Sequence, residues 1–116
     1  MTTVTLYGLT NCDSCRKARR WLHGHDHDVV VLDVRKDGLA SGDLARWANA
    51  VGWETLVNRK SRTWRELADA ERAALNETTA VSFLIAHPTL LKRPVVEDAD
   101  SGTVIVGFDP AAYAAL

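Results

Sequence analysis

The sequence predicts an α/β fold built on a four-stranded mixed β-sheet, and three observations agree on this. The first third of the chain reads as strand, helix and strand. The middle, about residues 41–87, shows only helical patterns, and the last quarter reads as two strands and a helix. We therefore expect one domain over residues 1–116, with an all-helical insertion between its βαβ and ββα halves.

The first half contains a clear βαβ pattern. Residues 4–7 are β-branched or aromatic and predict a strand, which Gly8 ends. The following residues have apolar side chains at helical spacing, namely Ala18, Trp21 and Leu22. Residues 29–34 are a mostly apolar run, which suits a buried strand paired in parallel with the first.

The middle and the end are read in the same way. Apolar spacing predicts helices at about residues 41–51, 53–57, from 63 onward, and 78–86. Residues 94–97 and 103–106 are two strands with a short turn between them, so they should form an antiparallel hairpin. Asp109 as N-cap and Pro110 at the first helical position then open a last helix.

Composition excludes several classes of function. A net charge of -1 gives no basic excess that would point to nucleic acid or to an anionic membrane. No stretch approaches the ~20 apolar residues of a membrane span, and the N-terminus does not resemble a signal peptide. With two cysteines three positions apart, we expect a monomeric protein of the reducing cytoplasm.

Both cysteines, Cys12 and Cys15, lie where the first strand passes into the first helix. Asn11 or Asp13 can cap this helix. Unpaired backbone N–H groups and the positive end of the helix dipole favour a thiolate at such a position. Arg16 adds positive charge nearby, so the pattern is typical of a reactive cysteine.

Two other interpretations of the Cys-x-x-Cys spacing remain open. A structural zinc site would need a second pair of ligands, which here would have to come from the downstream histidines His23, His25 and His27. Two inert buried thiols are the other alternative. Because the motif adjoins a βαβ pattern, we favour redox or nucleophilic use, no metal, and a thioredoxin-like fold.

Two segments, residues 12–18 and 87–94, resemble the arsenate-reductase-like (ArsC/Spx) family of thioredoxin-fold proteins. Residues 52–54 and 63–65 look like its small YffB-type branch, and the resemblance covers essentially the whole chain. It implies a thioredoxin-like sheet with a helical insertion, Cys12 as the nucleophile, and a cis peptide bond at Arg93-Pro94.

The chain departs from the family's reductases at three positions. Those enzymes hold an oxyanion with three arginines. In the basic loop three cations compete for one of these places, Arg59, Lys60 and Arg62, with Lys60 nearest to the family position. Gly107 occupies the place of another, which weakens the case for arsenate. Cys15 is extra, and gives Cys12 a resolving partner.

The resemblance therefore implies a glutathione-dependent thiol–disulfide oxidoreductase. Arg93 and Pro94, with Lys60 or Arg59, would hold a glutathione carboxylate, and Arg16 would tune the Cys12 thiolate. We expect no tightly bound cofactor, glutathione as co-substrate, and a small-molecule or protein disulfide or an oxyanion as substrate, with glutaredoxin as a further partner. The alternatives are an arsenate reductase and an Spx-type regulator that binds RNA polymerase, without direct nucleic-acid binding.

Overall fold

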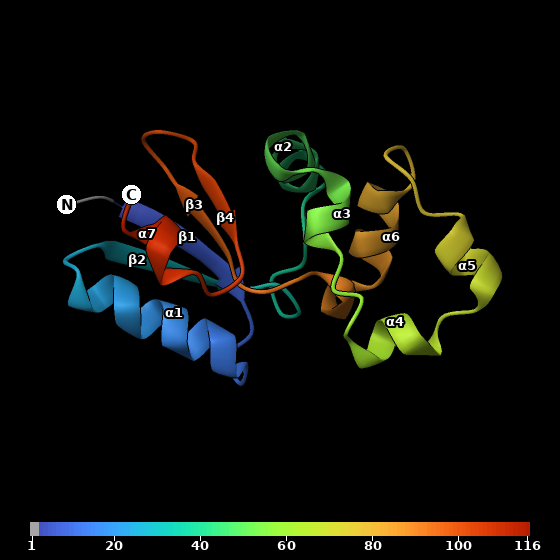
Figure 1. Ribbon diagram of the computed structural model, residues 1–116, viewed down its shortest axis with the longest axis horizontal. Helices are drawn as coiled ribbons and strands as arrows, with labels where there is room; N and C mark the ends of the chain where they lie inside the picture. Colours follow the sequence, from blue (N-terminus) through green and yellow to red (C-terminus); the bar gives the residue numbers. More distant parts are fainter. Residues whose placement is uncertain (1–2) are drawn as a thin grey trace. The chain divides into compact units, whose positions relative to one another are not determined.

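The computed structural model describes residues 3–116, which divide into two compact units (Figure 1). The sheet unit comprises residues 3–37 and 93–116, and the helical unit comprises residues 38–92. The predicted all-helical insertion lies within the helical unit. That the whole chain forms one domain stays a prediction.

Four strands make up the sheet, in the order β2-β1-β3-β4. They are β1 (Thr3–Gly8), β2 (Asp28–Asp33), β3 (Val95–Asp98) and β4 (Val104–Val106). β1 is parallel to β2 and antiparallel to β3, and β3 pairs with β4 as an antiparallel hairpin. The predicted mixed four-stranded sheet, with its βαβ and ββα halves, is confirmed.

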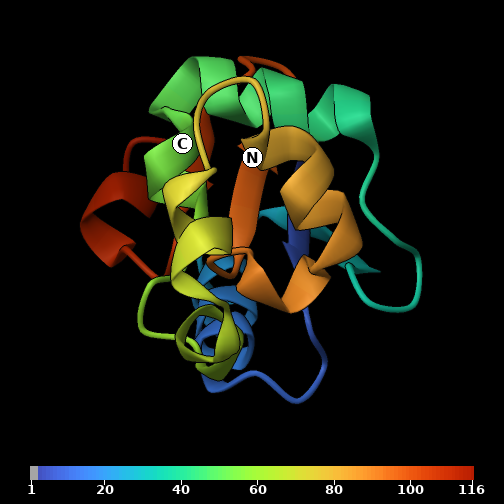
Figure 2. The ribbon, with the colours of Figure 1, turned by 90° about the vertical axis from the view of Figure 1, so that its right-hand side faces the viewer.

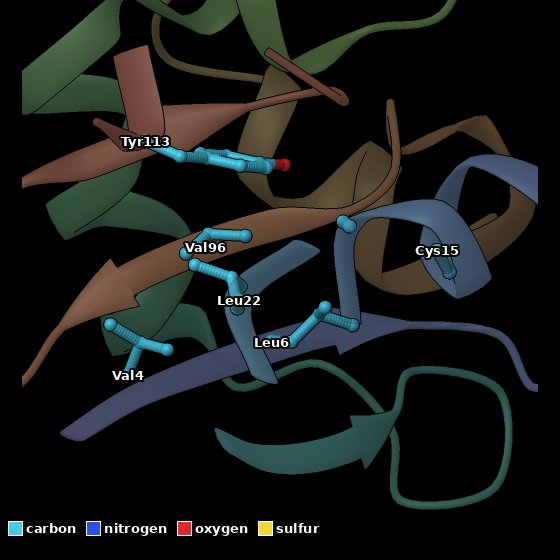
Figure 3. Close-up of a cluster of buried hydrophobic side chains, with 7 residues drawn as sticks. Val4, Leu6, Cys15, Leu22, Val96 and Tyr113 are labelled. Carbon is cyan, nitrogen blue, oxygen red and sulfur yellow. The ribbon is translucent and has the colours of Figure 1, made fainter. Parts of the chain in front are cut away.

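The core of the sheet unit lies between one face of the sheet and two helices, α1 (Asp13–Gly24) and α7 (Pro110–Tyr113). Figure 3 shows its main side chains, which are Val4, Leu6, Cys15, Ala18, Leu22, Val96 and Tyr113. The members from α1 are spaced three and four positions apart, as one face of a helix requires. One cysteine of the motif therefore belongs to the hydrophobic core.

The start of α1 differs from the prediction. Neither Asn11 nor Asp13 caps the helix, because the N-cap residue is Cys12, with extended backbone and no side-chain capping hydrogen bond. The turn after β1, in which the Cys12 N–H donates to the Leu9 carbonyl over 3.3 Å, sets this position. Asp13 lies one residue inside the helix and pairs with Lys17 at 3.2 Å. A thiol rather than a carboxylate thus occupies the cap position.

The helical unit contains five α-helices and a 3-10 turn among the residues that the structure describes (Figure 2). They are α2 (Ser41–Val51), α3 (Trp53–Leu56), α4 (Arg62–Glu66), α5 (Asp69–Ala73), α6 (Ala80–Ala86) and η1 (Pro88–Leu90). α2 and α6 lie side by side, green and gold in Figure 2. None of the described helices is both long and apolar enough to cross a membrane.

Two boundaries in this unit have simple causes. Gly52 ends α2 with a φ of +87°, a conformation that glycine adopts without steric cost. The helical stretch predicted from residue 63 is divided into α4 and α5, because Leu67 and Ala68 both take extended backbone. An isolated antiparallel bridge joins Val57, directly after α3, to Leu91, near the end of the unit.

Candidate thiol site

The site is organised around Cys12, at the carboxyl end of β1 and the amino end of α1. Its extended backbone, with φ −90° and ψ 124°, leaves the first N–H groups of α1 without a side-chain acceptor from the cap. The Cys12 side chain is partly buried against the core. A thiolate here can accept hydrogen bonds from the start of the helix.

The pKa of Cys12 lies below its ordinary value, although partial burial acts in the opposite direction. Hydrogen bonds from the backbone N–H and the thiol of Cys15 favour the thiolate, and the positive charge of Arg93 and the backbone N–H of Ser14 add to this. Donors and cations stabilise the charged form and therefore outweigh desolvation. The role of Cys12 as the nucleophile stays a prediction, which its lowered pKa supports.

Cys15 has the opposite character. Its side chain is 4% exposed, and burial raises the pKa of its thiol to about 12, helped by its hydrogen bond to Cys12 and by the charge of that neighbour. The Leu9 backbone and Arg93 act in the other direction without compensating. At neutral pH Cys15 therefore remains a thiol, which can donate a hydrogen bond to the Cys12 sulfur.

Arg93 and Pro94 directly precede β3, which lies beside β1 in the sheet. Their peptide bond is cis, as the resemblance implied. The Pro94 carbonyl accepts a hydrogen bond of 2.8 Å from the Gly107 N–H. The residue before β3 is therefore paired with the residue after β4. The pairing of Tyr7 with Val95 aligns this segment with the end of β1. This explains how the charge of Arg93 acts on both cysteines.

Arg16 was predicted to tune the thiolate. Its guanidinium lies 3.9 Å from the Asp13 carboxylate, and its side chain is 58% exposed. The side-chain charge that lowers the pKa of Cys12 comes from Arg93. A tuning role for Arg16 stays a prediction, and the described geometry favours Arg93 for it.

The basic loop belongs to the helical unit. Arg59 pairs with Glu54 at 3.5 Å and lies over the Trp64 ring, 5.7 Å from its centroid. Arg62 pairs with Glu66 at 2.9 Å. The Lys60 ammonium, in contrast, has no acidic partner among residues 3–116. Lys60 is thus the cation of this loop most available to an external anion, and its assignment as an anion ligand stays a prediction.

The histidine-rich segment after α1 makes local contacts. The His25 ring stacks on Trp21 with 3.6 Å between ring centroids, and its Nδ1 lies 2.8 Å from the Trp21 carbonyl oxygen. Within residues 3–116, no three side chains of the His, Cys, Asp and Glu types gather closely enough to hold a metal ion.

Two residues of the site were missed by sequence reasoning. A Cβ atom at Gly8 would lie only 2.5 Å from the Cys15 sulfur, so glycine there leaves room for this thiol. The buried Tyr113 hydroxyl donates to the Gly107 carbonyl over 2.6 Å, which fixes the turn after β4. Burial raises the pKa of Tyr113. The position of Gly8 directly before the motif was the available signal, whereas nothing in the sequence marked Tyr113.

A model of the ArsC family matches residues 7–116. The chain belongs to the ArsC family. The match includes both cysteines, the basic loop and the Arg93-Pro94 pair, and the thioredoxin-like fold with a helical insertion agrees with it. Family membership and the two-cysteine site together support an oxidoreductase.

Relatives similar in sequence include an uncharacterized protein and a transcriptional regulator. An uncharacterized protein of Haemophilus influenzae is 39% identical over 112 residues, which cover 97% of this chain and 96% of that protein. The global transcriptional regulator Spx of Streptococcus mutans is 31% identical over 100 residues, or 82% of this chain and 70% of that protein.

Solved structures agree with this placement. The structure of a protein named YffB is 40% identical, with a TM-score of 0.89 over 97% of this chain and 96% of that one. An arsenate reductase (ArsC) related protein from Brucella melitensis is 41% identical, with a TM-score of 0.74 over 97% of this chain and 92% of that one. The resemblance to the YffB-type branch is therefore confirmed.

Proposed function

We propose that this protein is a glutathione-dependent thiol–disulfide oxidoreductase. The observation that carries the proposal is the pair of unlike cysteines, a Cys12 thiol with a lowered pKa beside a buried Cys15 thiol that donates to it. A thiolate at neutral pH is the form that attacks disulfides.

In the first step the Cys12 thiolate attacks one sulfur of a disulfide or of a glutathionylated thiol. The substrate S–S bond breaks, a mixed disulfide with Cys12 forms, and the leaving thiolate takes a proton from water. In the second step a glutathione thiolate attacks the other sulfur of the mixed disulfide, which releases the Cys12 thiolate and forms a new disulfide. For a glutathionylated thiol, the sum converts this mixed disulfide and one glutathione into the free thiol and glutathione disulfide.

Two thiols can resolve the mixed disulfide. Glutathione attacks the sulfur bound to Cys12, whereas Cys15 attacks the Cys12 sulfur itself, expels the bound thiol and forms a Cys12–Cys15 disulfide that two further glutathione molecules must reduce. While Cys12 is a thiolate, its charge and its hydrogen bond both raise the pKa of Cys15. Both effects vanish once Cys12 is held in a mixed disulfide, which leaves burial as the main obstacle. Glutathione dissolved in water does not have this obstacle, and this supports glutathione as the co-substrate.

Charge supports the same choice. Glutathione carries two carboxylates and one ammonium, so its net charge is one negative near neutral pH. Arg93 on the sheet unit, whose positive charge acts on both cysteines, offers a cation for one of these carboxylates. No tightly bound cofactor is needed, and glutaredoxin could reduce an oxidised intermediate in a reducing cytoplasm.

The experiment measures turnover of a glutathionylated peptide by the full chain, with glutathione as reductant. We expect Cys12→Ser to abolish turnover and Cys15→Ser to retain a substantial part of it. Free cysteine, the amino acid, supplied in place of glutathione as the sole thiol reductant, should give a clearly lower rate of turnover. Equal rates with both reductants would reject glutathione dependence, and full activity of Cys12→Ser would reject the nucleophile.

Arsenate is the second candidate substrate, favoured by the relative from Brucella melitensis that is named as ArsC-related. Cys12 would attack arsenic instead of sulfur. Against this, Gly107 stands where the family has an arginine, and a compact dianion needs several converging donors. Incubation with arsenate, glutathione and glutaredoxin tests it, and efficient arsenite formation that Arg93→Ala abolishes would replace the first proposal.

The relatives named Spx keep a third reading open, a redox-switched regulator that binds RNA polymerase. Its test is co-purification of the full chain with RNA polymerase in the reduced and oxidised states. Absence of turnover on both substrates, together with polymerase binding, would favour this reading.

A further inference from the structure

A crevice opens in the sheet unit between α1 and the edge of the sheet. Leu6, Leu9 and Val31 form its apolar wall, and Cys15 borders it from the helix. Leu6 and Cys15, from β1 and α1, appear in Figure 3. Its volume is about 60 Å³, well below the ~300 Å³ of ordinary ligand pockets, so the crevice takes only a small apolar group and leaves the rest of a ligand in solvent.

The crevice exists because β2 is an edge strand. Val31 pairs with Leu6 in the parallel register, so both side chains point to the face that α1 covers. Leu6 is only 1% exposed, whereas Val31 is 38% exposed. The helix thus covers β1 fully and leaves apolar surface of β2 open to an apolar group from outside.

Two arginines of α1, Arg16 and Arg19, also line the crevice. They are three positions apart and share one face of the helix. Arg16 is held loosely, since its exposed guanidinium is 3.9 Å from Asp13. Arg19 has no acidic partner in the part of the chain that the structure describes. The crevice therefore combines an apolar wall with one free and one partly neutralised guanidinium.

We propose that this crevice binds a small monocarboxylate with a short apolar tail. The tail packs against Leu9 and Val31, and the carboxylate lies between Arg16 and Arg19. A single negative charge matches this cation pair better than a dianion, because Asp13 already takes up part of the charge of Arg16. Cys12 is not among the residues that line the crevice, although Cys15 and Arg16 are, so a bound carboxylate does not cover the Cys12 sulfur.

The test is an NMR titration of the reduced, ¹⁵N-labelled full chain with hexanoate, hexanol and acetate. Hexanoate should give saturable shifts at the amides of Leu9, Thr10 and Val31. Hexanol lacks the charge and acetate lacks the tail, so each should bind at least about tenfold more weakly than hexanoate. Equal affinity for hexanol and hexanoate, or shifts that do not saturate, would overturn the proposal.

Matched variants locate the site. Arg19→Gln should weaken hexanoate binding about tenfold, while Arg20→Gln, an exposed neighbour outside the crevice, should leave it unchanged. Val31→Glu places a negative charge in the crevice and should abolish binding. Val30→Glu is its control, since Val30 is 48% exposed on the opposite face of β2. An equal loss in Arg20→Gln or Val30→Glu would show general charge attraction and reject the crevice.

Discussion

At the scale of single residues, the site depends on two thiols with opposite properties. Cys12 occupies the cap position of α1, and Cys15 lies in the core one helical turn later. The hydrogen bond between them lowers the pKa of Cys12 and raises that of Cys15. Each cysteine therefore defines the role of the other.

Alkylation should report this difference. With limiting iodoacetamide at pH 6 to 7, we expect Cys12 to be labelled first. Cys15→Ala removes a donor to the thiolate, so the pKa of Cys12 should rise and its labelling at this pH should slow several-fold. Peptide mass spectrometry over a pH series measures both. Preferential labelling of Cys15 would reverse the two roles.

The charge that supports the thiolate can be assigned in the same way. Arg93→Gln should raise the pKa of Cys12 and slow its alkylation near pH 6.5, and added salt should reduce the difference from the wild type. Arg16→Gln is the comparison, because the Arg16 side chain is exposed and its charge is partly neutralised by the Asp13 carboxylate. A larger effect of Arg16→Gln would favour the assignment made from the sequence.

Gly8 gives a prediction about packing. In Gly8→Ala the new methyl group would lie 2.5 Å from the Cys15 sulfur, so we expect a loss of about 1–3 kcal/mol in the free energy of unfolding. Adding Cys15→Ala removes the sulfur and should recover much of this loss. Urea denaturation of the four chains of this double-mutant cycle, all reduced, measures the coupling.

The control is Gly42→Ala in α2, where a Cβ meets nothing within 4 Å. This variant should be as stable as the wild type or more stable by up to about 1 kcal/mol. If Gly8→Ala and Cys15→Ala change the free energy of unfolding additively, close packing against the Cys15 sulfur does not explain why residue 8 is glycine.

At the scale of elements, α7 holds the end of β4 in place. Asp109 caps this helix by accepting from the Ala112 N–H over 3.1 Å, as predicted with Pro110 at its first position. Tyr113, on the same short helix, donates to the Gly107 carbonyl. Gly107 in turn donates to Pro94, so a hydrogen-bonded path runs from α7 to the residue after Arg93.

Tyr113→Phe should weaken this connection. The phenylalanine fills the same space but leaves the buried Gly107 carbonyl without its donor, so we expect a loss of about 1–3 kcal/mol in the free energy of unfolding. Urea denaturation measures the loss. A variant as stable as the wild type would mean that water replaces the hydroxyl.

Local patterns in the sequence were sufficient for the elements but not for their contacts. Apolar spacing predicted α1 and the four strands. The role of Cys12 as the nucleophile stays a prediction, which its lowered pKa supports. The N-cap predicted for α1 was wrong, because the turn after β1 sets where the helix starts, rather than the preference of Asn or Asp for the cap position. The action of Arg93 on the cysteines depends on a contact between distant segments, and those of Gly8 and Tyr113 depend on how the turns next to them fold, which residue spacing does not show.

At the scale of the whole molecule, the raised pKa of Cys15 links stability to pH. In the unfolded chain this thiol ionises near 9.0, and in the folded chain near 12. The unfolded state therefore loses its proton first as the pH rises. The stabilisation is complete below pH 9 and is lost progressively between pH 9 and 12.

We thus expect the free energy of unfolding to fall between pH 8 and 10.5, and to fall less steeply in Cys15→Ala. Urea midpoints under reducing conditions at several pH values measure both chains. The comparison separates the pair of thiols from other groups that ionise in this range, including Tyr113. Parallel curves for the two chains would show that Cys15 does not contribute.

The sheet unit is built from two distant segments, residues 3–37 and 93–116. Arg93 and β3 leave the ribosome long after Cys12 and the first helix. A chain that is still being synthesised therefore lacks both the guanidinium and the strand that complete the site. Until synthesis reaches residue 93, Cys12 lacks the positive charge that Arg93 contributes in the folded chain, and only the hydrogen bonds from Cys15 and Ser14 can favour its thiolate.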